Sequence, residues 1–487
     1  MRLGSHQFRR SALWATAEGV FTLVVTLIAT IAAAAIMGTR EFGLGALASL
    51  IGTIAEVIVA IPFSEGLIAR RRLSSTVIST ANVSMISLGV GTFLLLCASG
   101  PFFAYWLQEP ILVQLIPVQG LCCILLALRG VPEVLLARGL AFKTLSVRQI
   151  VAKAVSALVI MVLALSGAGS WALVLGNVAF ALTATVIVLK VAPRLSRSRV
   201  SVARAKQLFS FGIYPLIEAL LWTITQRTYI FILGFTHGVG VLGQVSLAFR
   251  INEAMGNVLA SVSTRMAYPL LATLSTDHKQ LNNAFLSGTH LMFVFTAPCF
   301  LGAALISTDF ITVLLGRDWL ATGAVLSATS LFSLFAFARI LVPSLLKSLN
   351  QPQSLLWIQL IGLVYIIAGT LFAVEAGFEA QLFVWGSAGI VYFLVSLSVV
   401  SSVARIAIVE QLLPLRRALY SLLGLSLTVV ILNHLLGEVE IHVRLMISVA
   451  LGAAVYIGSS VLLEAKLVKH TLSSKFAPRS RRQEGVS

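Results

Sequence analysis

The chain has 487 residues, of which 58% are hydrophobic and only 11% are charged, and its formal net charge is +17. Soluble globular domains average about 25% charged and about 45–50% apolar residues, so this composition excludes a water-soluble enzyme or binding module and indicates an integral membrane protein. The positive charge does not indicate nucleic-acid binding, because the basic residues fall in short segments between apolar runs.

Apolar runs long enough to cross the hydrocarbon core of a bilayer occur along the whole chain. The first follows three arginines but is too long for the apolar part of a signal peptide, so we expect an uncleaved transmembrane helix. We predict about fourteen transmembrane helices, at residues 12–36, 44–69, 77–98, 111–137, 147–168, 170–191, 210–235, 240–265, 285–308, 320–346, 354–375, 380–402, 418–436 and 443–463. The predicted fold class is therefore all-α and integral to the membrane.

A repeated sequence connects the first two helices of each half. Residues 38–51 (GTREFGLGALASLI) and 238–251 (GVGVLGQVSLAFRI) are identical at five positions: Gly38/Gly238, Gly43/Gly243, Leu47/Leu247, Ala48/Ala248 and Ile51/Ile251. The same register relates Glu18 to Glu218. Because internal repeats are common in secondary transporters, this pattern indicates a duplicated six-helix unit.

The repeat and the basic linker from Pro193 to Lys206 predict three parts of the chain. These are an N-terminal six-helix lobe (1–206), a C-terminal six-helix lobe (207–404), and two additional helices with a basic tail (405–487). If the N-terminus is cytoplasmic, 26 of the 35 Lys and Arg residues fall in inner segments or, for Arg148 and Lys190, at the inner ends of predicted helices, whereas only Arg40, Arg317 and Arg444 fall in outer loops. Positive residues concentrate on the cytoplasmic side of membrane proteins, so we predict that both termini lie there.

Several classes of chemistry have no motif in this chain. There is no GxxxxGK[ST] phosphate loop, no HExxH and no GxSxG, and the four cysteines and seven histidines show no metal-like spacing. We therefore expect no ATP hydrolysis, no catalytic residues, no metal and no cofactor. A polysaccharide polymerase or ligase remains an alternative, but the short outer loops leave little room for the extended external region that such an enzyme needs.

Ionisable residues inside the predicted helices require an explanation, because inserting each one into the centre of the bilayer costs roughly 2.5–3.5 kcal/mol. The candidates are Glu18, Glu56, Glu65, Arg129, Glu133, Lys153, Glu218, Arg227, Arg250, Glu253, Arg265 and Arg339. Their spacing allows pairs within one helix, Arg129 with Glu133 and Arg250 with Glu253. Those near inner helix ends, Glu65, Lys153 and Arg265, are expected to reach the interface.

Arg227 and Arg339 have no carboxylate within one helical turn, so we expect them to face protein or a water-filled cavity. Converging arginines suit an anionic headgroup, because guanidinium binds phosphate through two charge-assisted hydrogen bonds. The candidate headgroup residues are therefore Arg250, Arg227 and Arg339, with Arg129 as the counterpart in the first lobe. The candidate cavity carboxylates are Glu18, Glu218 and Glu253, which could pair with these arginines, carry protons or simply be solvated.

Five segments, in this order, resemble a known family. They are FGLGALA (Phe42–Ala48), GAGSWALV (Gly167–Val174), LGQVSLAFRI (Leu242–Ile251), YPLLATLSTD (Tyr268–Asp277) and LLGRDWLATGAVL (Leu314–Leu326). The chain resembles the polysaccharide transporters of the multidrug/oligosaccharidyl-lipid/polysaccharide superfamily, which includes O-antigen and exopolysaccharide repeat-unit flippases. Two positions depart from the family pattern: Tyr229 stands near where members often carry an acid, and Gln244 stands where they carry a tyrosine.

The resemblance implies two pseudo-symmetric six-helix lobes in a V shape, two extra C-terminal helices and alternating access. It also implies transport of an undecaprenyl-diphosphate-linked oligosaccharide across the bacterial inner membrane, for exopolysaccharide or lipopolysaccharide biosynthesis. The implied partners are this lipid-linked oligosaccharide, membrane lipids, and polymerase and chain-length proteins, with no nucleic acid. A proton- or sodium-coupled small-molecule antiporter of the same fold is the second alternative.

Overall fold

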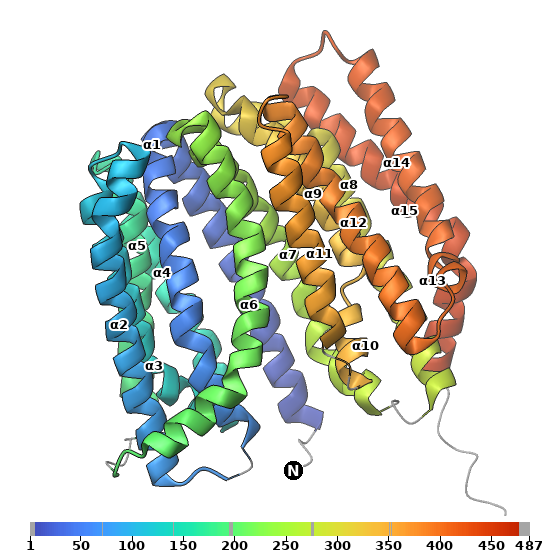
Figure 1. Cartoon of the computed structure of the whole chain (residues 1–487). Coiled ribbons are helices and arrows are strands. Elements are labelled where there is room, and N and C mark those ends of the chain that lie inside the picture. Colours follow the sequence, from blue (N-terminus) through green and yellow to red (C-terminus); the bar gives the residue numbers. More distant parts are fainter. Residues whose placement is uncertain are drawn as a thin grey trace, which may run out of the picture.

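The computed structural model describes the backbone of residues 5–70, 72–139, 141–193, 198–273, 277–349, 351 and 353–476. Side chains are described for the same residues except 5–17, 20, 69, 142, 261–273, 278 and 464–476. Within these ranges the protein is helical and has no β-strand, which confirms the predicted all-α class. Figure 1 shows the helices as one bundle, with the last two at the side away from α2.

The elements in chain order are α1 (Ser5–Ala69), α2 (Ser75–Leu107), α3 (Leu112–Arg138), α4 (Phe142–Leu165), α5 (Trp171–Val191), α6 (Val202–His237), α7 (Val239–Thr273), α8 (His278–Leu315), η1 (Arg317–Trp319), α9 (Leu320–Ala338), α10 (Val342–Ser348), α11 (Gln353–Phe372), α12 (Phe378–Ala404), α13 (Ile408–Leu412), α14 (Leu415–Leu435) and α15 (Ile441–Phe476). Twelve helices of the described chain are long and apolar enough to cross a membrane. The 65-residue α1 folds back at Gly38, so each of its two limbs is a candidate crossing. The 35-residue α7 is long enough for a further crossing but is not one of these twelve helices. The arrangement is roughly consistent with the count of about fourteen predicted from the sequence.

The two copies of the repeat begin at glycines with the same unusual backbone. Gly38 interrupts α1 with φ 75° and ψ 172°, and Gly238 separates α6 from α7 with φ 89° and ψ 170°. A positive φ is accessible to glycine at little cost because it has no Cβ. We call the end of the bundle that carries these residues the glycine end, and the opposite end, with Arg70 and Arg138, the basic end. Helix α1 begins near the basic end (Figure 1).

The second limb of α1 and the start of α7 pack backbone against backbone near the glycine end. A methyl group added at Gly43 would lie 3.1 Å from the amide nitrogen of Gly243 and would overlap the carbonyl oxygen of Val239. A methyl group added at Gly243 would lie 2.9 Å from the Gly43 nitrogen and would overlap the carbonyl oxygen of Thr39. The repeated glycines therefore permit the two lobes to touch here.

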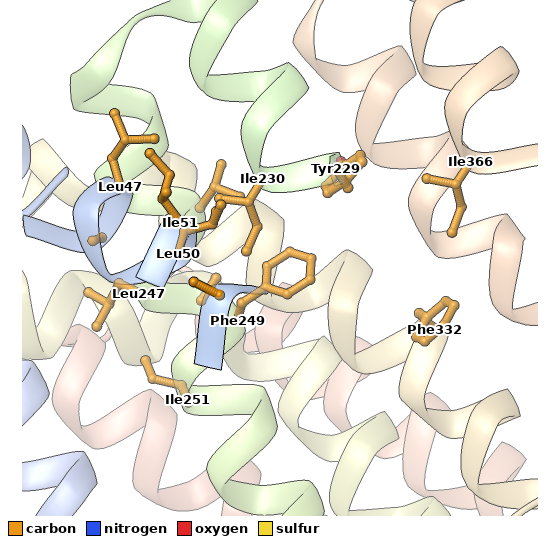
Figure 2. Packing of buried hydrophobic residues seen from close by; sticks show 14 of the residues in the cluster. Leu47, Leu50, Ile51, Tyr229, Ile230, Leu247, Phe249, Ile251, Phe332 and Ile366 are labelled. Atoms are coloured by element: carbon orange, nitrogen blue, oxygen red, sulfur yellow. The ribbon is translucent and has the colours of Figure 1, made fainter. Parts of the chain in front are cut away.

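Repeated apolar residues complete this contact. Leu47, Ile51, Leu247 and Ile251 belong to one cluster of buried hydrophobic residues, and Figure 2 shows them where α1 and α7 cross. Burial of such side chains contributes roughly 1.5–3 kcal/mol each, so the contact between the lobes is substantial. The identity of the repeats is thus explained by their packing on each other.

Helix α6 connects the two lobes. Near the basic end it packs on α1, where Gly212 lies directly against the backbone of Pro62. Near the glycine end it joins the C-terminal lobe, where Tyr229 stacks on Trp385 at 4.5 Å between ring centroids and donates a hydrogen bond to the Gln381 carbonyl oxygen at 3.1 Å. The predicted lobe boundary at residue 206 therefore falls in the part of α6 that leans on the N-terminal lobe.

The last two long helices, α14 and α15, pack on α8. Arg444 donates two hydrogen bonds of 2.9 Å to the carboxylate of Asp309, and the Tyr456 hydroxyl donates to the Val294 carbonyl oxygen at 2.7 Å. A separate cluster of buried hydrophobic residues fills the space between these helices. They are thus attached to the C-terminal lobe and lie away from the contact between the repeats.

Candidate functional site

A cavity of about 520 Å³ lies between the lobes, with walls from α1, α3, α4, α5, α6 and α7. Ala46 and Ser246 line it close to the contact between Gly43 and Gly243. From there it extends towards the basic end, to Glu18 and Val258. The contact between the repeats therefore closes the cavity at the glycine end.

Polar stripes on otherwise apolar helices form the walls. On the second limb of α1, Ser49, Thr53 and Glu56 follow at i, i+4 and i+7, which places them on one helix face. The Asn177 amide of α5 donates to the Ser49 hydroxyl at 2.9 Å and to the Gln119 side-chain oxygen at 3.2 Å. The cavity thus presents hydroxyl and amide groups that can exchange hydrogen bonds with a hydrated or sugar-like ligand.

Four basic side chains line the cavity: Arg129, Lys153, Arg227 and Arg250. Three carboxylates line it as well: Glu18, Glu56 and Glu253. Glu18 accepts a hydrogen bond of 2.6 Å from the Ser146 hydroxyl. The structure therefore brings together three of the four predicted headgroup arginines and two of the three predicted cavity carboxylates.

The expected pair within α7, Arg250 with Glu253, is wrong. Glu253 pairs instead with Arg227 of α6, at 3.2 Å between Oε1 and Nη2. The Arg250 guanidinium lies 5.8 Å from the centre of the Phe42 ring on α1, and it forms no ion pair within the described part of the chain. Neighbouring helices, rather than spacing along one helix, decide these partners, and no carboxylate of the described residues lies within ion-pair distance of Arg250.

The expected pair within α3 is confirmed, but it is shared. Arg129 lies 3.8 Å from Glu133, and Arg148 of α4 also pairs with Glu133. One carboxylate therefore serves two guanidinium groups, and the Nη1 atom of Arg129 has no hydrogen-bond partner among the described residues. The aromatic ring of Phe180 lies 5.9 Å from Arg129 and 5.6 Å from Lys153, so cation–π contacts hold both cations at the cavity wall.

Arg339 and Glu218 do not line this cavity. Arg339 follows the last residue of α9, and its guanidinium lies 4.8 Å from the Tyr392 ring inside the C-terminal lobe. Glu218 pairs with Lys347 at 3.4 Å. Glu218 precedes Arg227 by nine residues on α6, which is two and a half turns, so the two side chains point to opposite faces of the helix.

Sequence reasoning missed the role of Lys153, which was expected to reach the membrane interface. In the structure Lys153 lines the cavity, together with Gln149 of the same helix. The signal was present, because Ser146, Gln149 and Lys153 follow at i, i+3 and i+7 and form one polar stripe on α4. Arg265 and most of the segment Tyr268–Asp277 lie outside the described side chains.

The two departures from the family pattern lie away from the cavity lining. Tyr229 is fully buried in the aromatic core of the C-terminal lobe, against Trp385 and Phe249. The backbone carbonyl of Gln244 accepts a hydrogen bond from Thr322 at 3.2 Å. The cavity's charged groups therefore come from other positions of α1, α3, α4, α6 and α7.

Comparison with known proteins identifies the family. A family model described as "Polysaccharide biosynthesis protein" matches residues 32–324, which is more than half of the chain. The chain belongs to this polysaccharide biosynthesis family. The match includes both copies of the repeat and the cavity-lining parts of α3 to α7, and it confirms the family expected from the sequence motifs.

Curated relatives of this chain have names that refer to polysaccharide biosynthesis or transport. The teichuronic acid biosynthesis protein TuaB of Bacillus subtilis (strain 168) is 23% identical over 279 residues, which are 57% of this chain and 58% of that protein. The match thus spans less than two thirds of that relative. The succinoglycan biosynthesis transport protein ExoT of Rhizobium meliloti (strain 1021) is 24% identical over 390 residues, covering 77% of this chain and 76% of that protein.

Solved structures show the same fold. The lipid II flippase MurJ in an inward closed conformation has a TM-score of 0.77 at 13% identity, covering 94% of this chain and all of that one. An inward-facing multidrug resistance transporter of the MATE family has a TM-score of 0.53 at 14% identity, covering 85% of this chain and 95% of that one. The family member is therefore a multi-pass membrane protein with the fold of flippases and multidrug transporters.

The ion pair between Arg227 and Glu253 allows stability to be separated from function. The two side chains are 21% and 39% exposed, so we expect Glu253→Gln to lower the free energy of unfolding by only about 1 kcal/mol. The double variant Arg227→Glu/Glu253→Arg should restore the pair and the melting temperature. If the protein exports polysaccharide, as proposed below, the double variant should still export it poorly, because the guanidinium has moved from α6 to α7.

Both quantities can be measured on the same preparations, as thermal unfolding of the purified protein and as surface polysaccharide in a complemented deletion strain. Full export by the double variant would mean that Arg227 serves stability alone.

Proposed function

We propose that this protein is a flippase. It moves an undecaprenyl-diphosphate-linked oligosaccharide across the bacterial inner membrane for exopolysaccharide or lipopolysaccharide biosynthesis. The printed names of its relatives, which refer to succinoglycan transport and teichuronic acid biosynthesis, support this polysaccharide class. The fold it shares with a lipid II flippase supports a lipid-linked cargo.

The observation that carries the proposal is the set of basic side chains that line the cavity between the lobes. Arg250 lacks a carboxylate partner among the described residues, and Arg129 shares its carboxylate with Arg148. Guanidinium groups with free donors bind phosphate oxygens through paired, charge-assisted hydrogen bonds. Arg250, Arg227, Arg129 and Lys153 would hold the diphosphate, with Glu253 released from Arg227 as the headgroup binds.

The uncharged polar side chains of the cavity walls can form hydrogen bonds with the sugar. Ser49, Thr53, Gln119 and Asn177 offer hydroxyl and amide groups within the same cavity. The sugar would cross in this polar space while the lipid tail stays among apolar side chains, so that neither part is transferred into an unfavourable medium.

Transport proceeds in this proposal by alternating access. The predicted orientation places the basic end in the cytoplasm, so the closed contact at Gly43 and Gly243 faces outwards and the cavity serves the inner leaflet. Opening that contact and closing the basic end would expose the headgroup to the other side. Polymerase and chain-length proteins would then receive the delivered unit.

A small-molecule antiporter is the second candidate, and the fold shared with a MATE transporter favours it. Such a protein uses cavity carboxylates to bind a cation. Glu56 fits this role, because it lines the cavity and has no ion pair within the described chain. The other two cavity carboxylates are engaged, Glu18 by Ser146 and Glu253 by Arg227.

A deletion strain distinguishes these functions. Lipid-linked oligosaccharides are extracted after intact spheroplasts have been treated with a sugar-oxidising reagent that does not cross membranes. Accumulation of units protected from the reagent is the result expected of a flippase. Accumulation of oxidised units would indicate a polymerase or ligase, and intact surface polysaccharide without accumulation would indicate the antiporter.

A further inference from the structure

An apolar groove of about 490 Å³ lies beside the charged cavity, between the second limb of α1, α2 and α6. Its walls carry Ile54 and Ile58 of α1, Leu95 of α2 and Ile224 of α6. Leu95 is 65% exposed, so this wall faces the region that membrane lipid occupies around the protein. The groove therefore offers an apolar path along the side of the bundle.

The groove and the cavity meet at two residues. Leu50 of α1 and Arg227 of α6 line both spaces. Arg227 uses Nη2 for its ion pair with Glu253, and its buried Nε atom has no hydrogen-bond partner in the described part of the chain. A guanidinium with a free donor therefore stands at the junction between a polar space and an apolar one.

Aromatic side chains bound the groove towards the glycine end. Trp106 of α2 stacks on Phe231 of α6 at 5.4 Å between ring centroids, and Phe103 contacts the same ring at 6.4 Å. These contacts join α2 to α6. The groove consequently leads from Arg227 along α2 and ends at an aromatic wall.

We propose that this groove binds the isoprenoid tail of a polyprenyl-diphosphate lipid, with the diphosphate at Arg227. This inference rests on the proposed function and adds the place of the tail to it. A lipid of this kind joins a doubly charged group directly to a long apolar chain. Arg227 at the junction complements the charge of the diphosphate, and the apolar walls beyond it match the isoprenoid chain. One ligand of this kind would therefore occupy both the polar cavity and the apolar groove.

The test uses the full-length protein in phospholipid nanodiscs and a geranylgeranyl diphosphate that carries a photoreactive group in its chain. We expect crosslinks in residues 92–106 of α2 and 224–231 of α6. Leu95→Trp, which fills the groove, should lower this labelling by about tenfold. The matched control is Leu94→Trp, because Leu94 is 59% exposed on the same helix and does not line the groove; it should label like the unaltered protein.

Two further measurements make the outcome decisive. Ser99→Phe, one turn further along the groove wall, should reproduce the loss, and both groove variants should keep their affinity for inorganic diphosphate. Labelling confined to other helices would overturn the proposal. Equal labelling of Leu95→Trp and Leu94→Trp, or equal labelling by the photoreactive alcohol without diphosphate, would mean that ordinary membrane lipid occupies the groove.

Failure of this inference is distinguishable from failure of the proposed function. If Arg250→Ala abolishes export and lipid-linked units accumulate inside, the flippase proposal stands even when the groove is not labelled. If the deletion strain accumulates no such units, the proposed function fails whatever the crosslinks show.

Discussion

Arg250→Lys is expected to lower polysaccharide export by about 10–100-fold although the positive charge is kept. Lysine cannot form the paired hydrogen bonds that a guanidinium makes with a phosphate, and a hydrogen bond to a charged group contributes about 1.5–3 kcal/mol. Arg250 has no carboxylate partner among the described residues, so the substitution breaks no ion pair seen in the structure. Export is measured as surface polysaccharide in a complemented deletion strain, relative to the amount of protein in the membrane.

Arg339→Lys is the matched control. The sequence places Arg339 in the same candidate site, whereas in the structure it lies against Tyr392 inside the C-terminal lobe. We expect this variant to export at nearly the unaltered level per inserted molecule. Equal loss in both variants would mean that Arg339 also belongs to the headgroup site, as the sequence predicted. Full export by Arg250→Ala would contradict the proposal that Arg250 binds the headgroup.

Gly243→Ala is expected to open the contact at the glycine end and to lower export by about tenfold. The new methyl group would overlap the carbonyl oxygen of Thr39 and lie 2.9 Å from the Gly43 nitrogen. These are backbone atoms that cannot rotate away, so the helices must separate, and overpacking of this kind costs about 1–3 kcal/mol. A cysteine at Ser246, in a chain without its four native cysteines, should then react faster with an impermeant maleimide added from the predicted outer side.

The control for this variant is Gly240→Ala. Position 240 lies in the first turn of the same helix, and the nearest atom to an added methyl group is the Thr39 hydroxyl oxygen at 3.6 Å, an ordinary contact distance. Both the maleimide rate and export should therefore stay unchanged. If Gly243→Ala behaves like Gly240→Ala, the contact between the repeats does not close the cavity at the glycine end.

The amino-acid sequence by itself determined the class of protein and the approximate number of its membrane-spanning helices. The length of an apolar run and the position of its flanking charges are properties of contiguous residues, and they act whatever the neighbouring helices do. The repeat was visible in the same way, because Gly43 and Gly243 occupy equal positions in two similar segments. Even the polar stripe of Ser146, Gln149 and Lys153 follows from local periodicity.

Only the tertiary structure decided which charges share a cavity. Spacing favoured Arg250 with Glu253, but α6 brings Arg227 to Glu253, and α4 brings Arg148 to Glu133. The sequence also assigned Arg339 to the headgroup site, but the end of α9 directs this side chain to Tyr392. A side chain's partner depends on the rotation of its helix about the helix axis and on the helices packed beside it. Both are set by contacts between residues far apart in the chain. The fold and most of the cavity's charged residues were therefore predictable, whereas the ion-pair partners and the positions of Arg339 and Glu218 outside the cavity were not.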